Sequence, residues 1–384
     1  MIKKAILFIL ITLIIFSNSV ISTDTFKSLD NYYYILTLGI DKAENDEIKI
    51  TVQILENSGQ SSENSNEHPI LYSSTGKTLL SCISTLETSL NKQINMSHCS
   101  AIIFSNDILK SDFVSNIIAT LGNNSEIRNT TYIFSCNQTA FEFLETISNS
   151  KENFTANTYE RFLDSSYDIG YTEVCTFGKL FSSSKRPDNS ILIPYINLNE
   201  EQNSNKKIYQ INGSVILKNN KYIANLSPYE CLYINILSNS LKSGNINIPS
   251  PFKENKYIDL QVYSHKRTQI KTHIINNSPY VEIKVFPEFL IKSSGSNYNY
   301  LSEENVIILE SSLKNYLEKD FTNICYKITK ELNTDLLSLK DLYKTNYLTY
   351  DEFNKLKFSS IYQNTSYKIT VYPYIVSSNL FNKQ

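Results

Sequence analysis

The segment VIILESSLKNYLEKDFTNICYKITKEL, residues 306–332, carries the clearest structural signal in the chain. Its apolar residues recur at steps of three and four, the period of one face of an α-helix. They are Val306, Leu309, Leu313, Leu317, Phe321, Ile324, Ile328 and Leu332. A helix of about seven turns, about 40 Å long, would bury these side chains with a gross gain on the order of 12–24 kcal/mol before entropy is subtracted. It must therefore lie along a sheet or a partner, and the sheet of its own domain is the expected cover.

Strand-like segments stand on both sides of this helix. Before it, residues 34–40 are apolar and β-prone, and isoleucine or valine alternates with polar residues over 48–54. Residues 257–291 predict three strands, with a turn at 276–279. After it, Tyr367, Ile369 and Val371 alternate into a final strand that ends near Val376.

The first half of the chain alternates between helical and strand patterns. Helices are predicted over 75–91, 107–121 and 140–147, with strands over 101–104 and 128–134 between them. Such alternation favours a mixed sheet with helices packed on it. The sequence therefore predicts a multi-domain α+β protein with mixed β-sheets, packed helices and a long amphipathic helix near the C-terminus.

Composition divides the chain into a leader and two domains. Residues 200–207 are polar and charged, so a linker is predicted there, between an N-terminal α+β domain over 24–198 and a C-terminal α+β domain over 208–376, the latter subdivided near 295. The second domain opens with a hairpin about Asn219-Asn220. A capping box then starts a helix, with Ser227 at the N-cap, Pro228 next and Glu230 at the third position.

The N-terminus predicts export. Lys3 and Lys4 precede an apolar run from Ala5 to Phe16, and small and polar residues follow at 17–19. This pattern is typical of a secretory signal over residues 1–22. The alternative is a membrane anchor, but a span needs about 20 apolar residues and this run is shorter. The rest of the chain is expected to work outside the membrane.

Charge and cysteine usage narrow the partners. The chain has 36 basic and 38 acidic residues, a net charge of −2, without a block of one sign. That argues against nucleic acid or an anionic membrane surface as the main partner. The six cysteines are widely spaced, and we expect most of them to be buried small hydrophobes with at most one disulfide. They are Cys82, Cys99, Cys136, Cys175, Cys231 and Cys325.

No catalytic, cofactor-binding or metal-binding residue is predicted. Ser74–Thr78 resembles the end of a phosphate-binding loop, but Leu71 stands where that loop requires glycine. His98-Cys99 is interpreted as a strand entering the core, since no orienting base accompanies it. Asp41 follows a strand and is interpreted as a turn residue. The sequence thus predicts a protein that binds other proteins and is not an enzyme.

Seven segments, in order, resemble the GerC, or Ger(x)C, family, the C subunit of spore germinant receptors. They are Leu38–Lys42, Ile50–Ile54, Gly76–Thr78, His98 with Ala101–Ile103, Ser125–Arg128, Gly213–Lys218 and Asp335–Leu339. The likeness covers nearly the whole mature chain. It implies a non-catalytic, membrane-associated subunit on the outer face of the spore inner membrane, acting with the membrane-embedded A and B subunits in nutrient germination. Two alternatives stay open, an extracytoplasmic ligand-binding protein and a cell-wall-active enzyme.

The chain departs from the family pattern at three places. Family members are usually lipoproteins, yet Thr23 stands where the lipid-bearing cysteine is expected, after Val20-Ile21-Ser22. The lipidation signal is thus present without its acceptor. The chain also has no tryptophan, and Ser338 replaces the first glycine of the family's Asp-Ile-Phe-Gly-Phe-Gly stretch. These departures concern the membrane anchor and the shape of the last domain.

Overall fold

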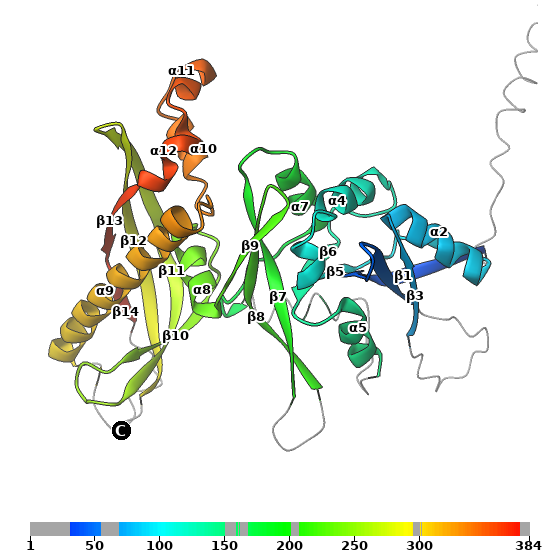
Figure 1. Cartoon of the computed structure of the whole chain (residues 1–384). Helices are drawn as coiled ribbons and strands as arrows, with labels where there is room; N and C mark the ends of the chain where they lie inside the picture. Colours follow the sequence, from blue (N-terminus) through cyan, green and yellow to red (C-terminus); the bar gives the residue numbers. More distant parts are fainter. Residues whose placement is uncertain are drawn as a thin grey trace, which may run out of the picture.

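Two β-sheets organise the chain and confirm the α+β class. The computed structural model describes residues 31–54, 69–149, 159, 161, 168–200, 207–294, 300 and 302–376. In Figure 1 the sheets lie to either side of one helix, α8 (Pro228–Leu237). The predicted signal sequence 1–22, Thr23 and the predicted subdivision near 295 lie outside the described residues.

The first sheet has nine strands and is mixed. Its order is β3-β2-β1-β5-β6-β7-β8-β9, and β4 pairs with β1. The strands are β1 (Tyr32–Lys42), β2 (Ile48–Ile54), β3 (Ile70–Gly76), β4 (Gln93–Asn95), β5 (Ala101–Ser105), β6 (Tyr132–Cys136), β7 (Ser190–Glu200), β8 (Lys207–Lys218) and β9 (Lys221–Leu226). The central strands β1, β5, β6 and β7 run parallel, and antiparallel strands extend the sheet on each side.

Helices cover both faces of the first sheet (Figure 1). One core contains side chains of α2 (Leu79–Leu90), α3 (Asn106–Leu109), α4 (Val114–Asn123) and α7 (Phe177–Ser184), and a second core contains those of α5 (Ala140–Ser148). Because both faces are covered, six of the seven residues of β2 are buried rather than every second one.

Two helix predictions need correction. The helix expected from residue 75 begins at Leu79, since residues 70–76 form β3 and Thr78 caps the helix by accepting a hydrogen bond from the Ser81 N–H. The helix expected over 107–121 is two helices, α3 and α4. Ser111 separates them, because its hydroxyl donates to the Ile108 carbonyl and so closes the turn after α3.

Asp41 is not a turn residue. It lies within β1, buried, and its carboxylate accepts the backbone N–H groups of Ala140 at 2.6 Å and Phe141 at 3.1 Å, which caps α5. A Cβ on Gly39 would stand only 3.0 Å from side-chain atoms of Ala140 and Leu144. Gly39 and Asp41 therefore hold the N-terminus of α5 against the sheet. This contact joins residues that are about 100 positions apart in the sequence.

The two ends of the predicted linker, Glu200 and Lys207, belong to neighbouring strands of the first sheet, and residues 201–206 lie outside the described residues. Strands β7 and β8 pair antiparallel, with Glu200 opposite Lys207, so residues 201–206 connect neighbouring strands. Strands β8 and β9 then join through Asn219 and Asn220, both with positive φ, as the predicted hairpin requires. The sheet therefore extends to Leu226, past the position of the predicted linker.

Helix α8 connects the two sheets. It begins with the predicted capping box, in which Glu230 donates its N–H to the Ser227 hydroxyl and accepts the Ser227 N–H. Its residues from Cys231 to Leu237 are all buried. They share one core with Ile216 of the first sheet and Leu260 of the second. One helix is thus enclosed by both sheets.

The second sheet has five strands. Its order is β10-β11-β12-β13, with β14 also paired to β12. The strands are β10 (Gly244–Pro249), β11 (Tyr257–Ile275), β12 (Ser278–Ser294), β13 (Ser366–Val371) and β14 (Tyr374–Val376). The prediction of three strands over 257–291 is wrong, since two long strands fill this region. The register of β11 shifts between Ser264 and Gln269, which interrupts the sequence alternation without ending the strand.

The long helix is confirmed as part of the core. Helix α9 (Glu303–Tyr326) continues into a π-helical turn over Lys327–Glu331, and it lies along the second sheet in Figure 1. Six of the eight stripe residues are buried, whereas Val306 and Leu332 at the ends are half-buried. Three short helices follow, α10 (Leu339–Lys344), α11 (Tyr350–Lys355) and α12 (Phe358–Ile361).

The departure at Ser338 has a backbone explanation. Ser338 has φ 54° and ψ 36°, the left-handed region that glycine adopts without a Cβ penalty. The turn is held by Asp335, whose carboxylate accepts the N–H groups of Leu339 at 2.7 Å and Lys340 at 2.8 Å. Burial raises the pKa of this carboxyl, although those two hydrogen bonds act in the opposite direction. The glycine expected from the resemblance would suit this left-handed turn, which this chain forms with serine.

The first prediction concerns the core stripe of α9. Leu317→Asp should abolish folding, since an unpaired buried charge costs several kcal/mol against a total stability of about 5–15 kcal/mol. Ile307→Asp is the matched control, because Ile307 lies on the same helix with 67% exposure. Circular dichroism and protease resistance give the readout. A folded Leu317→Asp protein would show that the stripe is not core.

The second prediction concerns the left-handed turn. Ser338→Gly should raise the free energy of unfolding by roughly 1 kcal/mol, since it removes the steric cost of the left-handed conformation. Ser311→Gly, at an exposed position within α9, should lower it by roughly 0.5–1 kcal/mol. Urea denaturation measures both. Destabilisation by Ser338→Gly would contradict this account of the turn.

Candidate functional site

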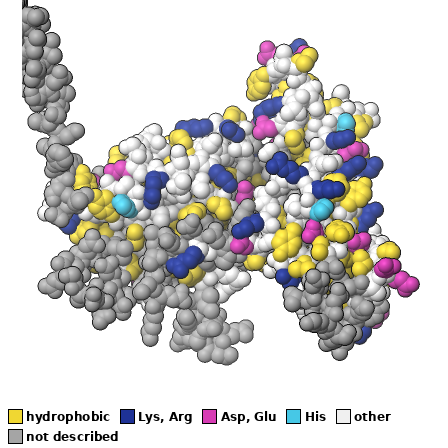
Figure 2. Space-filling view, turned by 180° about the vertical axis from the view of Figure 1, so that it is seen from behind, with side chains coloured by type: hydrophobic (Ala, Val, Ile, Leu, Met, Phe, Trp, Pro, Cys, Tyr) yellow, Lys and Arg dark blue, Asp and Glu magenta, His cyan; other side chains and the backbone are white. Residues whose placement is uncertain are grey.

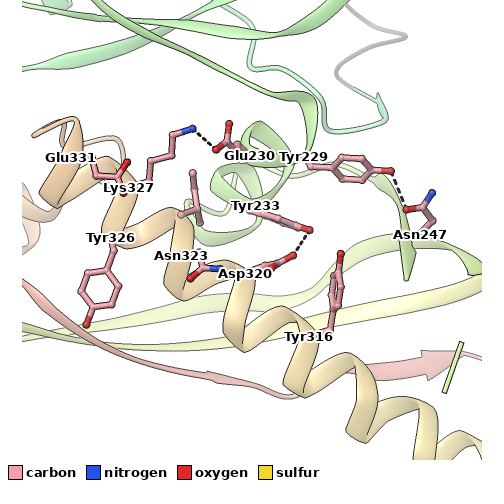
Figure 3. Close-up of a pocket in the computed structure, with 11 residues that line it drawn as sticks. Tyr229, Glu230, Tyr233, Asn247, Tyr316, Asp320, Asn323, Tyr326, Lys327 and Glu331 are labelled. Carbon is pink, nitrogen blue, oxygen red and sulfur yellow. Dashed lines mark hydrogen bonds and ion pairs between the residues drawn. The ribbon is translucent and has the colours of Figure 1, made fainter. Parts of the chain in front are cut away.

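A hollow lies between α8, α9 and the edge strand β10, with a volume of about 560 Å³. Figure 3 shows its tyrosine and acidic side chains converging from the two helices. The residues that matter for its chemistry are Tyr229, Glu230, Tyr233, Tyr316, Asp320, Lys327 and Glu331. We call this space the tyrosine hollow.

Helical periodicity brings these residues together. Tyr316, Asp320, Asn323 and Lys327 follow one another at steps of four, three and four, so they form a polar stripe beside the apolar stripe of α9. From α8, Tyr229 and Tyr233 are also four residues apart and face the same space. The polar stripe was present in the sequence, but its partner helix is about 90 residues away and was not identified as such.

Two polar contacts join the helices across the hollow. The Tyr233 hydroxyl donates to Asp320 Oδ2 at 2.8 Å, and Lys327 Nζ donates to Glu230 Oε1 at 2.5 Å (Figure 3). Lys327 is the first residue of the π-helical turn, a geometry that often marks functional positions. Both contacts hold the walls of the hollow in place.

These contacts shift the acidities of the lining groups. Burial raises the pKa of Tyr233 well above its usual value, and the neighbouring Asp320 carboxylate adds to this effect. Burial would also raise the pKa of Glu230, but hydrogen bonds from Lys327 and Ser227 outweigh it and hold that pKa below its ordinary value. Tyr233 therefore stays a neutral donor while Glu230 stays ionised.

A second hollow of about 550 Å³ adjoins the first and shares Tyr229 and Asn247 with it. Here the rings of Tyr171 and Tyr229 lie 5.7 Å apart. Burial raises the pKa of Tyr171 to about 12, with a further contribution from Tyr229. Asp259, Gln261 and Lys292 complete the polar lining. The two hollows form one binding surface beside β10.

The arrangement is suited to binding. Tyr233 is a neutral donor, and two of the carboxylates, Glu230 and Asp320, accept hydrogen bonds, so the hollow presents aromatic faces, donors and negative charge. Among the described residues no group of three or more metal-ligating side chains occurs. No cysteine or histidine of the described residues lines either hollow. Tyrosines with a few charged groups are the side chains that most often anchor protein interfaces.

The motifs considered in the sequence lie elsewhere. His98 is exposed with its ring 5.0 Å from that of Tyr34, whereas the neighbouring Cys99 is buried, and burial raises the pKa of its thiol to about 12. The pair therefore forms no nucleophile and base. Ser74 to Gly76 belong to strand β3 and so do not form a phosphate-binding loop. All six cysteines are buried and unpaired, which confirms their expected place in the core.

The surface agrees with the balanced charge. Figure 2 shows basic and acidic side chains scattered over the face it presents, with hydrophobic side chains between them on the C-terminal half. In the part of the chain that the structure describes, no helix is long and apolar enough to cross a bilayer.

The chain is thus a two-sheet α+β protein with two adjoining hollows beside β10. The comparisons with known proteins specify the family. The "Spore germination protein N-terminal domain" matches residues 26–198, and the "Spore germination B3/GerAC like, C-terminal" domain matches residues 212–379. The chain belongs to this GerC-like family, which is the C-subunit type of germinant receptors.

Individual relatives agree with the family. Spore germination protein B3 of Bacillus subtilis (strain 168) is 22% identical over 354 residues, which cover 90% of this chain and 91% of that protein. Spore germination protein A3 of the same organism is 24% identical over 249 residues, or 64% of this chain and 63% of that one. The crystal structure of the GerBC protein superposes with a TM-score of 0.58 at 19% identity, covering 88% of this chain and 97% of that one. It shares the fold.

The third prediction concerns the pH dependence of the contact between α8 and α9. Because the pKa of Glu230 is lowered in the folded protein, the ion pair with Lys327 contributes fully above the ordinary value of 4.5 and is lost as the pH falls through the folded pKa. Glu230→Gln should therefore cost about 0.5–1 kcal/mol at neutral pH and nothing in strong acid, since Gln retains the capping box.

Chemical denaturation at neutral and acid pH measures this difference. Glu331→Gln is the control, since Glu331 lines the same hollow and has no ion-pair partner among the described residues. It should match the wild type at both pH values. A cost of Glu230→Gln that persists in strong acid would assign the effect to packing instead of charge.

Proposed function

We propose that the chain is a non-catalytic, extracytoplasmic subunit of a nutrient germinant receptor, needed for the receptor to assemble and for spores to germinate. The observation that carries the proposal is the pair of family domains, which together account for residues 26–198 and 212–379. The relatives that match are spore germination proteins. The described residues supply no catalytic constellation that would suggest another role.

The proposed partners are the membrane-embedded A and B subunits of the receptor. A site on the outer face of the spore inner membrane is supported by the signal-like residues 1–22. The tyrosine hollow supports binding to protein, because its exposed rim carries Tyr229 and its walls carry charged groups already ordered by hydrogen bonds. Order in the free protein lowers the entropy cost of association.

A second candidate is a ligand-binding protein that takes up the nutrient itself. The volume of about 560 Å³ favours it, since small-molecule sites usually measure about 300–1,000 Å³. The two functions differ in what Asp320→Asn should change. A nutrient site predicts a shift in the nutrient concentration for half-maximal germination. An assembly role predicts an unchanged concentration dependence.

The fourth prediction tests the receptor role in spores. Deletion of the gene should abolish or slow nutrient-triggered germination and leave germination by receptor-bypassing agents unaffected, since those agents do not act through the subunit. His98→Ala and Cys99→Ser should lower germination only in proportion to lost protein, because neither residue belongs to a reactive pair. The measurement is germination rate against subunit abundance.

Two outcomes would contradict the proposal. Normal nutrient germination in the deletion strain would remove the receptor role. Variants at clustered polar positions that keep normal abundance and partner association but lose activity would indicate a chemical or ligand site.

A further inference from the structure

Strand β10 presents an open edge. It is the terminal strand of the second sheet and pairs with β11 on one side. Ser250 N–H bonds the Lys256 carbonyl toward the sheet, whereas the Asn245 carbonyl points outward, where it accepts a long 3.4 Å hydrogen bond from the Tyr171 hydroxyl. Antiparallel pairing alternates with a period of two, so the N–H and carbonyl of Asn247 also point outward.

The opposite edge of the same sheet is closed. Glu318 Oε1 accepts the backbone N–H of Val371 at 3.0 Å, and Glu310 Oε1 accepts that of Ile375 at 3.0 Å. Both glutamates come from α9, so carboxylates occupy the donors that another strand would need. Among the described residues, β10 receives no such protection at Asn247, which leaves the sheet with one blocked edge and one open edge.

The two hollows lie beside the open edge. The tyrosine hollow is walled by helices that pack on one face of the sheet, while the second is lined by Asp259, Gln261 and Lys292. An added strand would direct successive side chains to opposite faces. Gln261 Oε1, in the second hollow, is buried and has no hydrogen-bond partner among the described residues.

The charge of the tyrosine hollow indicates which side chain of a partner would occupy it. The tyrosine hollow contains three carboxylates, Glu230, Asp320 and Glu331, and one ammonium, Lys327. A lysine or arginine side chain would reduce this excess negative charge and meet aromatic faces that favour cations. A second copy of this chain is disfavoured, because pairing β10 with itself would bring two negative hollows together.

We propose that β10 is a docking edge that accepts an extended segment of a partner polypeptide with a basic side chain directed into the tyrosine hollow. The segment pairs with the outward groups of Asn245 and Asn247, and Pro249, which lacks an N–H, limits the pairing to this short stretch. Main-chain hydrogen bonds provide the affinity for the segment, and the tyrosine hollow selects segments that carry a basic side chain. The proposal rests on edge geometry and does not depend on the receptor assignment.

The test uses a labelled peptide of alternating threonine and valine with one central lysine, and its glutamate counterpart. Fluorescence anisotropy measures the binding of each peptide to the full chain. Asn247→Pro should weaken binding of the lysine peptide about tenfold, since it removes an outward donor and adds a ring at the edge. Asn247→Ala, the matched control, keeps the main-chain donor and loses only the 3.4 Å contact from the Tyr229 hydroxyl, so it should bind at least about fivefold more tightly than Asn247→Pro. The glutamate peptide should bind more weakly by at least about fivefold.

Hydrogen exchange and sedimentation complete the test. The lysine peptide should slow exchange of the Asn247 amide and leave the Val371 amide unchanged, since Glu318 already bonds the latter. Failure of the wild type to bind, or equal binding by Asn247→Pro, would overturn the proposal. If sedimentation shows that the wild type is a dimer and that the Asn247→Pro variant is a monomer, the proposal would also be overturned, because a second copy of the chain would then occupy the edge.

Discussion

Seven consecutive residues of α8, Cys231–Leu237, are buried, so this part of the helix has no face exposed to solvent. One side packs on the first sheet and the other on the second, and its single buried amide, Asn235, donates to the Gly170 and Thr172 carbonyls. A helix buried all round requires cover on every side. Each sheet alone would expose part of α8, so this helix holds the two sheets together. The first sheet itself combines both family domains, because β9 and most of β8 fall within residues 212–379.

The burial of α8 between the two sheets also positions the candidate site. The first turns of α8 carry Tyr229 and Tyr233 to the point where α9 and β10 meet, and Glu230 reaches Lys327 in the π-helical turn. The hollow is thus a product of how two elements pack, with its polar groups ordered before any partner arrives. A surface of this kind stabilises a complex through desolvated aromatic and charged contacts.

Local patterns in the sequence predicted what local physics determines. The stripe of α9, the capping box at Ser227 and the turn at Asn219-Asn220 were all found as expected, because each depends on neighbours within a few residues. Asp41 was misassigned because the N-terminus of α5 that it caps follows almost 100 residues later. Strand β3, helix α7 and the hollow were missed for the same reason, since long-range pairing and packing create them.

We propose that this chain acts in a receptor by binding through the surface that α8 holds beside β10. A photo-crosslinking amino acid placed at residue 247 in intact spores tests it most directly, with residue 370 on the closed edge as the comparison. The account predicts cross-links from residue 247 to a membrane-embedded receptor subunit and none from residue 370. Cross-links from residue 370 alone, or from neither position in spores that germinate normally, would contradict it.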